Sequence, residues 1–131
     1  MREILFRGKD KFDGLWYVGS LSHDTKYGNC FIEVSVHQGI AKEVIPETVG
    51  QYTGLTDKNG TKIFEGDILS EHLDELFPEE ESRYPVVWND YGWHIQCGNE
   101  SFETLEQWWV SKYLEVIGNV HDNPELLEGK S

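Results

Sequence analysis

Short apolar segments separated by turn residues run along most of the chain, and they predict a mainly β protein. Between Cys30 and Val36, apolar residues alternate with other residues at Ile32, Val34 and Val36, a period of two that places one face of a strand in a core. Such segments recur about every 8–12 residues, which is typical of small barrels and sandwiches. The predicted strands are 3–7, 15–18, 30–36, 62–64, 67–70, 84–88, 93–96 and 115–120, with short extended pieces at 44–45 and 49–52.

Two dipeptides that end in glycine mark turns between these strands. Asp13-Gly14 closes the connection after the first strand, so the first two strands are expected to form an antiparallel hairpin. Asn59-Gly60 can supply the pair of positive φ angles that a tight hairpin needs.

Helix is predicted at only two places. Residues 102–109 could form two turns, with Ser101 as N-cap and with Phe102, Leu105, Trp108 and Trp109 on one apolar side. Residues 123–127 are expected to form a terminal helical turn, with Asn123 as its cap and Pro124 in its first position.

The segment from Gln51 to Ile68, QYTGLTDKNGTKIFEGDI, is dense in turn residues and contains no catalytic motif. Together with residues 1–8, 85–88, 91–93, 114–120 and 123–127, it resembles the YopX-like family of phage and prophage proteins over nearly the whole chain. The resemblance implies a small antiparallel β subdomain over 1–50 and an SH3-like barrel over 51–131. It brings no catalytic residue, because the family's biochemical role is unassigned.

Composition indicates a folded, cytoplasmic protein, and the resemblance to phage proteins implies that the cell is a bacterial host. Of the 131 residues, 38% are hydrophobic and 13% aromatic, enough for one domain or two small subdomains with a packed core. No apolar run approaches the roughly 20 residues of a membrane helix, and charged residues interrupt the N-terminus where a secretion signal would lie. Cys30 and Cys97 lie far apart and are expected to be reduced thiols.

The net charge of −13, from 24 acidic and 11 basic residues, argues against direct binding of nucleic acid. Two explanations stay open. Self-repulsion keeps a protein soluble, and a carboxylate-rich surface can bind a basic partner as a nucleic-acid mimic does. The candidate acidic surface comprises Glu71, Asp74, Glu75, Glu79, Glu80 and Glu81.

The sequence predicts no enzyme, no cofactor and no metal site. His72, Asp74 and Glu75 lie close enough to suggest a metal cluster, but no second His stands at helical spacing. The chain has no Gly-x-Ser-x-Gly elbow, and Gly54, Gly60 and Gly66 lie in a hairpin region rather than before a helix.

The aromatic residues are the best candidates for a binding surface. Trp108 and Trp109 are neighbours, so their side chains point in different directions and at least one is expected to be exposed. The sequence therefore predicts a non-catalytic, homo-oligomeric binding or assembly module. One alternative is an acidic effector, a nucleic-acid mimic or counter-defence protein, that binds a basic host protein. The other is a protein that binds a small ligand. The candidate interface residues are Tyr52, Trp88, Tyr91, Trp93, Trp108 and Trp109.

Overall fold

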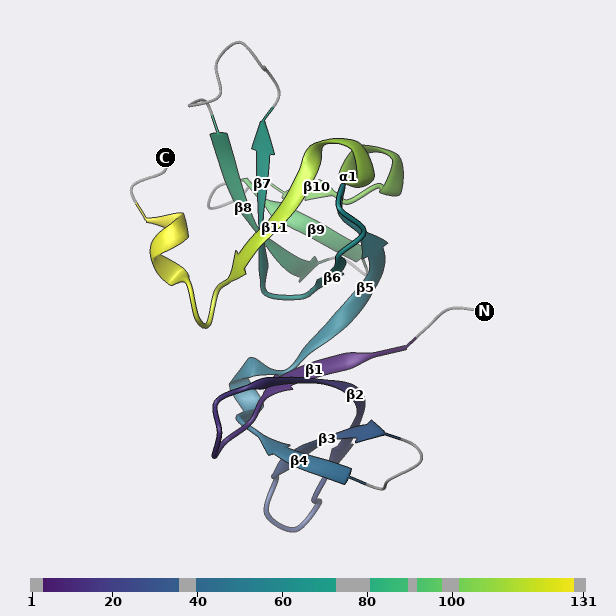
Figure 1. Ribbon diagram of the computed structural model, residues 1–131, viewed down its shortest axis with the longest axis vertical. Coiled ribbons are helices and arrows are strands. Elements are labelled where there is room, and N and C mark those ends of the chain that lie inside the picture. The colour runs from purple at the N-terminus through teal and green to yellow at the C-terminus, as the bar shows by residue number, and fades with distance from the viewer. Residues whose placement is uncertain (1–3, 36–39, 73–80, 90–91, 98–101, 129–131) are drawn as a thin grey trace. The chain divides into compact units, whose positions relative to one another are not determined.

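The computed structural model describes residues 4–35, 40–72, 81–89, 92–97 and 102–128 of the chain. These residues are mainly in antiparallel strands, which confirms the predicted fold class. The chain divides into two compact units, Met1–Tyr52 and Thr53–Ser131. Each unit is described in turn (Figure 1).

The first unit is an antiparallel sheet with the strand order β4-β3-β2-β1, to which the start of β5 is added beside β1. Phe6 to Lys9 pair with Gly19 to Trp16, so the predicted hairpin between the first two strands is confirmed. The elements are β1 (Phe6–Lys9), β2 (Trp16–His23), β3 (Cys30–Ser35), β4 (Ile40–Val44), the 3₁₀ turn η1 (Pro46–Thr48) and the first residues of β5 (Gly50–Thr56).

A small core holds the first unit together. Cys30, Ile32 and Val44 are buried, and the partly buried side chains of Phe6, Tyr17, Leu21 and Val49 pack against them. The predicted alternation along β3 is wrong at Val34, which is 40% exposed. The register between β3 and β4 shifts between Glu33 and Ser35, and such a bulge changes which face the next side chain occupies.

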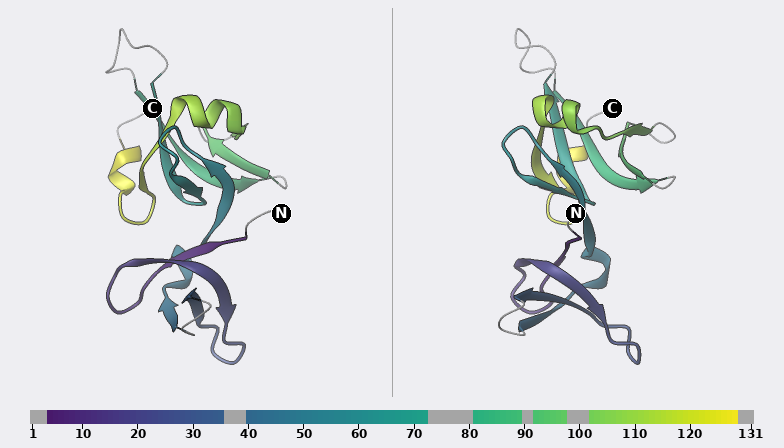
Figure 2. Two further views of the ribbon diagram at one scale, coloured as in Figure 1. Left: turned by 45° about the vertical axis from the view of Figure 1, so that its right-hand side comes forward. Right: turned by 90° about the vertical axis from the view of Figure 1, so that its right-hand side faces the viewer.

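The second unit has the strand order β10-β9-β8-β7-β11, and all of these pairings are antiparallel. The end of β5 and the short strand β6 also belong to this unit, where they pair with each other (Figure 2). An SH3-like arrangement stays a prediction. The elements after β5 are β6 (Lys62–Phe64), β7 (Asp67–His72), β8 (Glu81–Asn89), β9 (Gly92–Gln96), β10 (Phe102–Thr104), α1 (Gln107–Tyr113), β11 (Leu114–Asn119) and the 3₁₀ turn η2 (Pro124–Leu127).

The predicted helix over 102–109 is wrong in its position. Residues 102–104 form β10, which pairs with β9, and the helix begins only at Gln107. Pairing with the edge of β9 gives partners to those backbone groups of 102–104 that face it, so tertiary context decides between strand and helix here. The side chain of Gln107 exchanges hydrogen bonds with the backbone of Thr56 at 3.0 and 3.2 Å, which fixes the start of α1 against β5.

A larger core lies in the second unit. The helix α1 contributes Val110 and the following strand contributes Leu114, both fully buried. Trp109 is partly buried and packs against the same cluster. The buried members of the cluster are Ile63, Leu69, Val86, Trp93, Ile95, Leu105, Val110 and Leu114.

The connection from β5 to β6 is a three-residue turn rather than a two-residue one. The amide of Gly60 donates to the carbonyl of Asp57 at 3.0 Å, which places Lys58 and Asn59 in the centre of the turn. Gly60 has a φ of 81°, the left-handed conformation that closes this type of hairpin. The prediction that both Asn59 and Gly60 supply the positive φ pair of a two-residue hairpin is therefore corrected.

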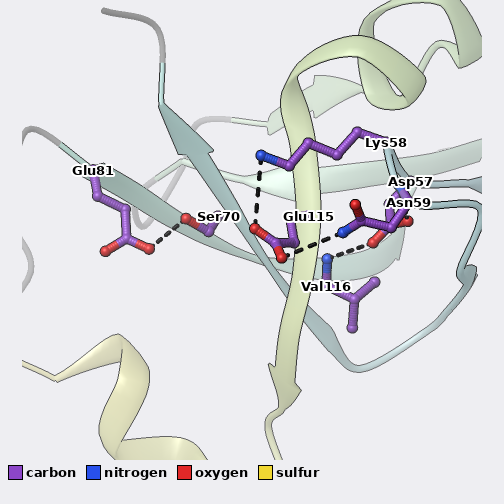
Figure 3. A network of polar contacts seen from close by, with 7 residues as sticks. All are labelled: Asp57, Lys58, Asn59, Ser70, Glu81, Glu115 and Val116. Carbon is purple, nitrogen blue, oxygen red and sulfur yellow. Dashed lines mark hydrogen bonds and ion pairs between the residues drawn. The ribbon is translucent and has the colours of Figure 1, made fainter. Parts of the chain in front are cut away.

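The side chain of Asp57 connects this turn to β11. Its Oδ1 accepts from the amides of Asn59 and Thr61, each at 2.9 Å. Its Oδ2 accepts from the amide of Val116 at 2.9 Å, as Figure 3 shows. The amide of Lys58 donates to the carbonyl of Leu114. Part of the segment that carries the family resemblance therefore has a structural role, because Asp57 and Lys58 hold the turn against β11.

The terminal turn lies where it was predicted, but the side chain of Asn123 does not cap it as expected. Asn123 makes no capping bond with its side chain to η2, and its Oδ1 instead accepts from the amide of Asn119 at 3.2 Å. Arg83 of β8 donates to the carbonyl of Leu126 at 3.2 Å, which holds η2 beside β8 (Figure 1). Within the part of the chain that the structure describes, no helix has the length and apolar character needed to cross a membrane.

Candidate aromatic and acidic cleft

An open cleft of about 540 Å³ lies in the second unit, within the size range of ligand pockets. Strands β7 to β10 and the segment around the start of α1 provide its walls. The lining combines the carboxylates of Glu71, Glu103 and Glu106 with aromatic rings and the thiol of Cys97. Ile95 and Thr104 complete the lining, and Ile95 is shared with the core beneath.

Glu71 is the deepest of the acidic groups. Its side chain extends from β7 and is only 6% exposed. Its Oε1 accepts from the hydroxyl of Tyr84 at 3.1 Å, and its Oε2 accepts from the indole N–H of Trp109 at 2.8 Å. A buried carboxylate is costly unless such donors compensate it.

The two neighbouring tryptophans serve different roles. Trp109 is partly buried, packs on the core and fixes Glu71. Trp108 is 67% exposed and lines the cleft, the exposure that adjacency of the two side chains predicts. The indole N–H of Trp108 donates to the carboxylate of Glu106, the residue that precedes α1 and does not cap it.

The charge in the cleft is one-sided. Among the residues that the structure describes, no Lys or Arg side chain lines it, and no ion pair to Glu71 occurs. The pKa of the Cys97 thiol is raised, first by partial burial and then by the charges of Glu103 and Glu71. Burial is also the main reason why the pKa of Tyr84 is raised, and the charge of Glu71 adds to it. The groups in the cleft therefore experience a negative field.

The net charge is also distributed unevenly between the units. Residues 1–52 hold seven acidic and six basic side chains, whereas residues 53–131 hold 17 acidic and five basic ones. Nearly all of the charge of −13 thus belongs to the unit that contains the cleft. A uniform requirement for solubility does not explain this distribution.

The predicted acidic surface is only partly described. Asp74, Glu75, Glu79 and Glu80 lie outside the described residues. Glu71 is buried, so its assignment to an exposed acidic surface is wrong. Glu81 is partly buried in β8, where it accepts from Ser70 (Figure 3). It also forms an ion pair with Arg83 at 2.9 Å. Of the two ends of the run, Glu71 is thus buried in β7 and Glu81 is partly buried in β8.

The predicted aromatic interface also divides into buried and exposed members. Tyr52 and Trp93 are each only 8% exposed, so neither offers a free ring to a partner. Trp88 is 51% exposed and contacts Trp93 edge-on across β8 and β9, with 4.7 Å between ring centroids. Tyr91 lies outside the described residues.

Sequence reasoning missed Tyr84, Cys97, Glu103 and Glu106 as members of a common site. The signal that could have found the last two is the acidic spacing immediately before the Trp108–Trp109 pair. The incorrect helix over 102–109 obscured it, because a helix and a strand direct Glu103 to different faces.

Among the described residues, no group of three or more His, Cys, Asp and Glu side chains could hold a metal ion. The predicted grouping of His72, Asp74 and Glu75 cannot be placed, because the last two residues and the side chain of the first lie outside the description. Cys97 has a raised pKa, the opposite of what an activated thiol nucleophile needs.

Comparisons with known proteins agree with the fold. The family model described as YopX protein matches residues 5–128. The crystal structure of protein EF1440 from Enterococcus faecalis is similar with a TM-score of 0.67 and 25% sequence identity, over 98% of this chain and 100% of that chain. Protein YopX from Bacillus subtilis is similar with a TM-score of 0.57 and 18% identity over the whole of both chains, which shows a shared fold. No curated protein matches the chain.

Proposed function

The chain belongs to the YopX protein family, and we propose that it is a non-catalytic binding module that holds a basic segment of a protein partner in the cleft of its second unit. The setting we propose is the cytoplasm of a bacterial host that carries a phage or prophage. This proposal takes up the acidic effector considered from the sequence and assigns its binding to the residues that line the cleft.

The observation that carries the proposal is the combination of exposed aromatic surface and uncompensated negative charge in the same cleft. Trp108 offers an exposed ring, and Glu71, Glu103 and Glu106 offer carboxylates. A cation over an aromatic ring gains about 0.5–2 kcal/mol, and opposite charges accelerate the encounter with a partner. An anionic ligand would meet repulsion from every charged group that lines the cleft.

The absence of catalysis is part of the proposal. The lining side chains provide carboxylates, rings and a thiol, but no general base paired with an activated nucleophile among the described residues. A carboxylate held by two neutral donors, such as Glu71, is suited to compensating a bound cation.

Titration of basic peptides against the protein, with isothermal calorimetry, tests the proposal. An eight-residue peptide of alternating Gly and Arg is the probe, and a matched peptide with Glu in place of Arg is the negative control. Trp108→Ala should weaken binding about tenfold. Trp88→Ala removes another exposed indole outside the cleft and should leave binding unchanged. No binding of the basic peptide at low salt, or equal losses in both variants, would reject the proposal.

A second candidate is homo-oligomeric assembly, and the exposed ring of Trp88 favours it. Trp88 lies at the end of the β8–β9 hairpin, where its edge contact with Trp93 leaves half of its surface accessible. Burial of such side chains between subunits contributes about 1.5–3 kcal/mol each, and salt screens the opposing repulsion. Light scattering should then show a mass above 15.2 kDa that increases with moderate salt, and a constant mass of 15.2 kDa rejects this candidate.

A further inference from the structure

The carboxylate of Glu71 is hydrogen-bonded by neutral donors only. The carboxylate receives one neutral hydrogen bond on each oxygen, from Tyr84 and Trp109. Carboxylates have about four acceptor sites, so two remain. The cleft lining supplies no cation within the described residues, and a positive group from a ligand can occupy this position.

The surroundings of Glu71 favour a planar cation over a compact one. An ammonium group is strongly hydrated and must lose that water to approach a carboxylate that is only 6% exposed. A guanidinium group is weakly hydrated, lies flat against aromatic rings and presents its N–H groups in a fork that matches a carboxylate. Tyr84, Trp108 and Trp109 provide such rings around the same space.

The outer carboxylates have a different role. Glu103 and Glu106 are exposed, and Glu106 already accepts from the indole of Trp108. Exposed charges attract any cation through a screened field and do not distinguish between guanidinium and ammonium. Selectivity should therefore depend on Glu71 and the rings, and general attraction on Glu103 and Glu106.

We infer that the cleft selects an arginine side chain of its protein partner over a lysine side chain. This inference rests on the proposed function, since it specifies which basic group occupies the site. Glu71 receives the guanidinium N–H groups, and the ring of Trp108 covers the guanidinium plane.

Two peptides of equal length and charge separate the inference from the proposed function. An eight-residue Gly-Arg repeat should bind about tenfold more tightly than the matching Gly-Lys repeat. If neither peptide binds, the proposed function fails and the inference fails with it. If both bind equally, the binding function stands and the arginine preference is overturned.

Variants then assign the preference to residues. Glu71→Gln should reduce the ratio between the two peptides to within about twofold, because the charged fork–fork pairing is lost. Glu103→Gln should weaken both peptides by the same factor and lower their salt dependence. A ratio unchanged by Glu71→Gln in a protein whose near-ultraviolet circular dichroism is unaltered would overturn the inference.

The unmodified protein provides a test that does not depend on the folding of a variant. Cys97 lines the cleft and is exposed, whereas Cys30 is buried. Bound Gly-Arg peptide should slow the reaction of Cys97 with iodoacetamide by more than the same concentration of Gly-Lys peptide. Equal protection by both peptides at concentrations below saturation would overturn the preference for arginine.

Discussion

The turns after β1 and after β5 are each held by a buried aspartate that accepts from backbone amides of its own turn. The two aspartates differ in whether they also bind a distant segment of the chain. Asp10 is 4% exposed and its Oδ1 accepts from the amides of Phe12 and Asp13 at 2.7 and 2.8 Å. Asp57 is 3% exposed and also accepts from two amides of its own turn. Asp57 additionally accepts from Val116, 59 residues further along the chain. The same local motif therefore shapes a hairpin in the first unit and joins distant segments in the second.

The two units also differ in charge, and the unit with the long-range turn is the acidic one. The first unit has nearly balanced charges, while the second holds 17 acidic against five basic residues and contains the cleft. Glu71 lies on β7, which pairs with β11. The same strand β11 donates the amide of Val116 to Asp57. The architectural network of the second unit thus supports the strand that carries the buried carboxylate of the cleft.

Replacing Asp57 should have the largest effect on stability. Asp57→Ala leaves three amide donors without their partner, and we expect a loss of about 3–5 kcal/mol in the free energy of unfolding. Urea denaturation measures it. Lys58→Ala is the matched control, since it removes only an exposed ion pair to Glu115 and should cost less than about 1 kcal/mol. A loss of similar size in both variants would contradict the role given to Asp57.

Replacing Asp10 tests the local counterpart. Asp10→Ala leaves two amide donors of a single turn unpaired, so the expected loss is about 2 kcal/mol, smaller than for Asp57→Ala. Hydrogen exchange should locate the increased exchange in the first unit and leave the amide of Val116 protected. If Asp10→Ala costs as much as Asp57→Ala, the distinction between a local and a long-range turn is lost.

Short-range patterns predicted most of the strands because these depend on neighbouring residues. The hairpin of β1 and β2 and the strands β6, β7, β9 and β11 follow from apolar segments bounded by turn residues. Val34 departed from its pattern because the bulge opposite β4 depends on a partner strand. Residues 102–104 became a strand because the edge of β9 was available to them.

The cleft could not be predicted from the sequence for a similar reason. Glu71 lies on β7, Cys97 directly follows β9 and Glu103 lies on β10, and only the antiparallel pairing of β7 to β10 brings them together. The sequence drew attention to the density of the acidic run, whereas the environment of Glu71 depends on Tyr84 and Trp109. Adjacency did predict one exposed ring in the Trp108–Trp109 pair, because that argument needs only local geometry.

Glycines in the two turns should respond alike, which sharpens the comparison of the aspartates. Gly14 and Gly60 have φ angles of 73° and 81°, and beyond their chain neighbours no residue comes within 4 Å of the position that a Cβ would take. Gly14→Val and Gly60→Val should each cost about 1–2 kcal/mol through left-handed strain alone. Thermal melts measure this, with Thr61→Val as a nearly neutral control on an exposed strand-side position. An unchanged melt for Gly60→Val would reject the turn assignment.

The smallest expected effect concerns the thiol that reports the negative field of the second unit. Partial burial raises the pKa of Cys97, and the charge of Glu103 is the next cause, followed by that of Glu71. Because only the thiolate reacts, this shift moves the pH–rate profile of alkylation to higher pH. Glu103→Gln removes one negative charge beside the thiol, so the midpoint should fall toward the ordinary value of 9.0.

Iodoacetamide, a neutral reagent, is the suitable probe because its own charge does not alter the encounter with the cleft. The reaction is followed by mass spectrometry between pH 7 and about pH 10, a range that brackets the ordinary thiol pKa. Cys97→Ser measures the background from Cys30, which is buried in the first unit and should react slowly at every pH. If Glu103→Gln leaves the midpoint of Cys97 where it was, the charges of the cleft do not reach the thiol, and the contrast in field between the two units loses its local reporter.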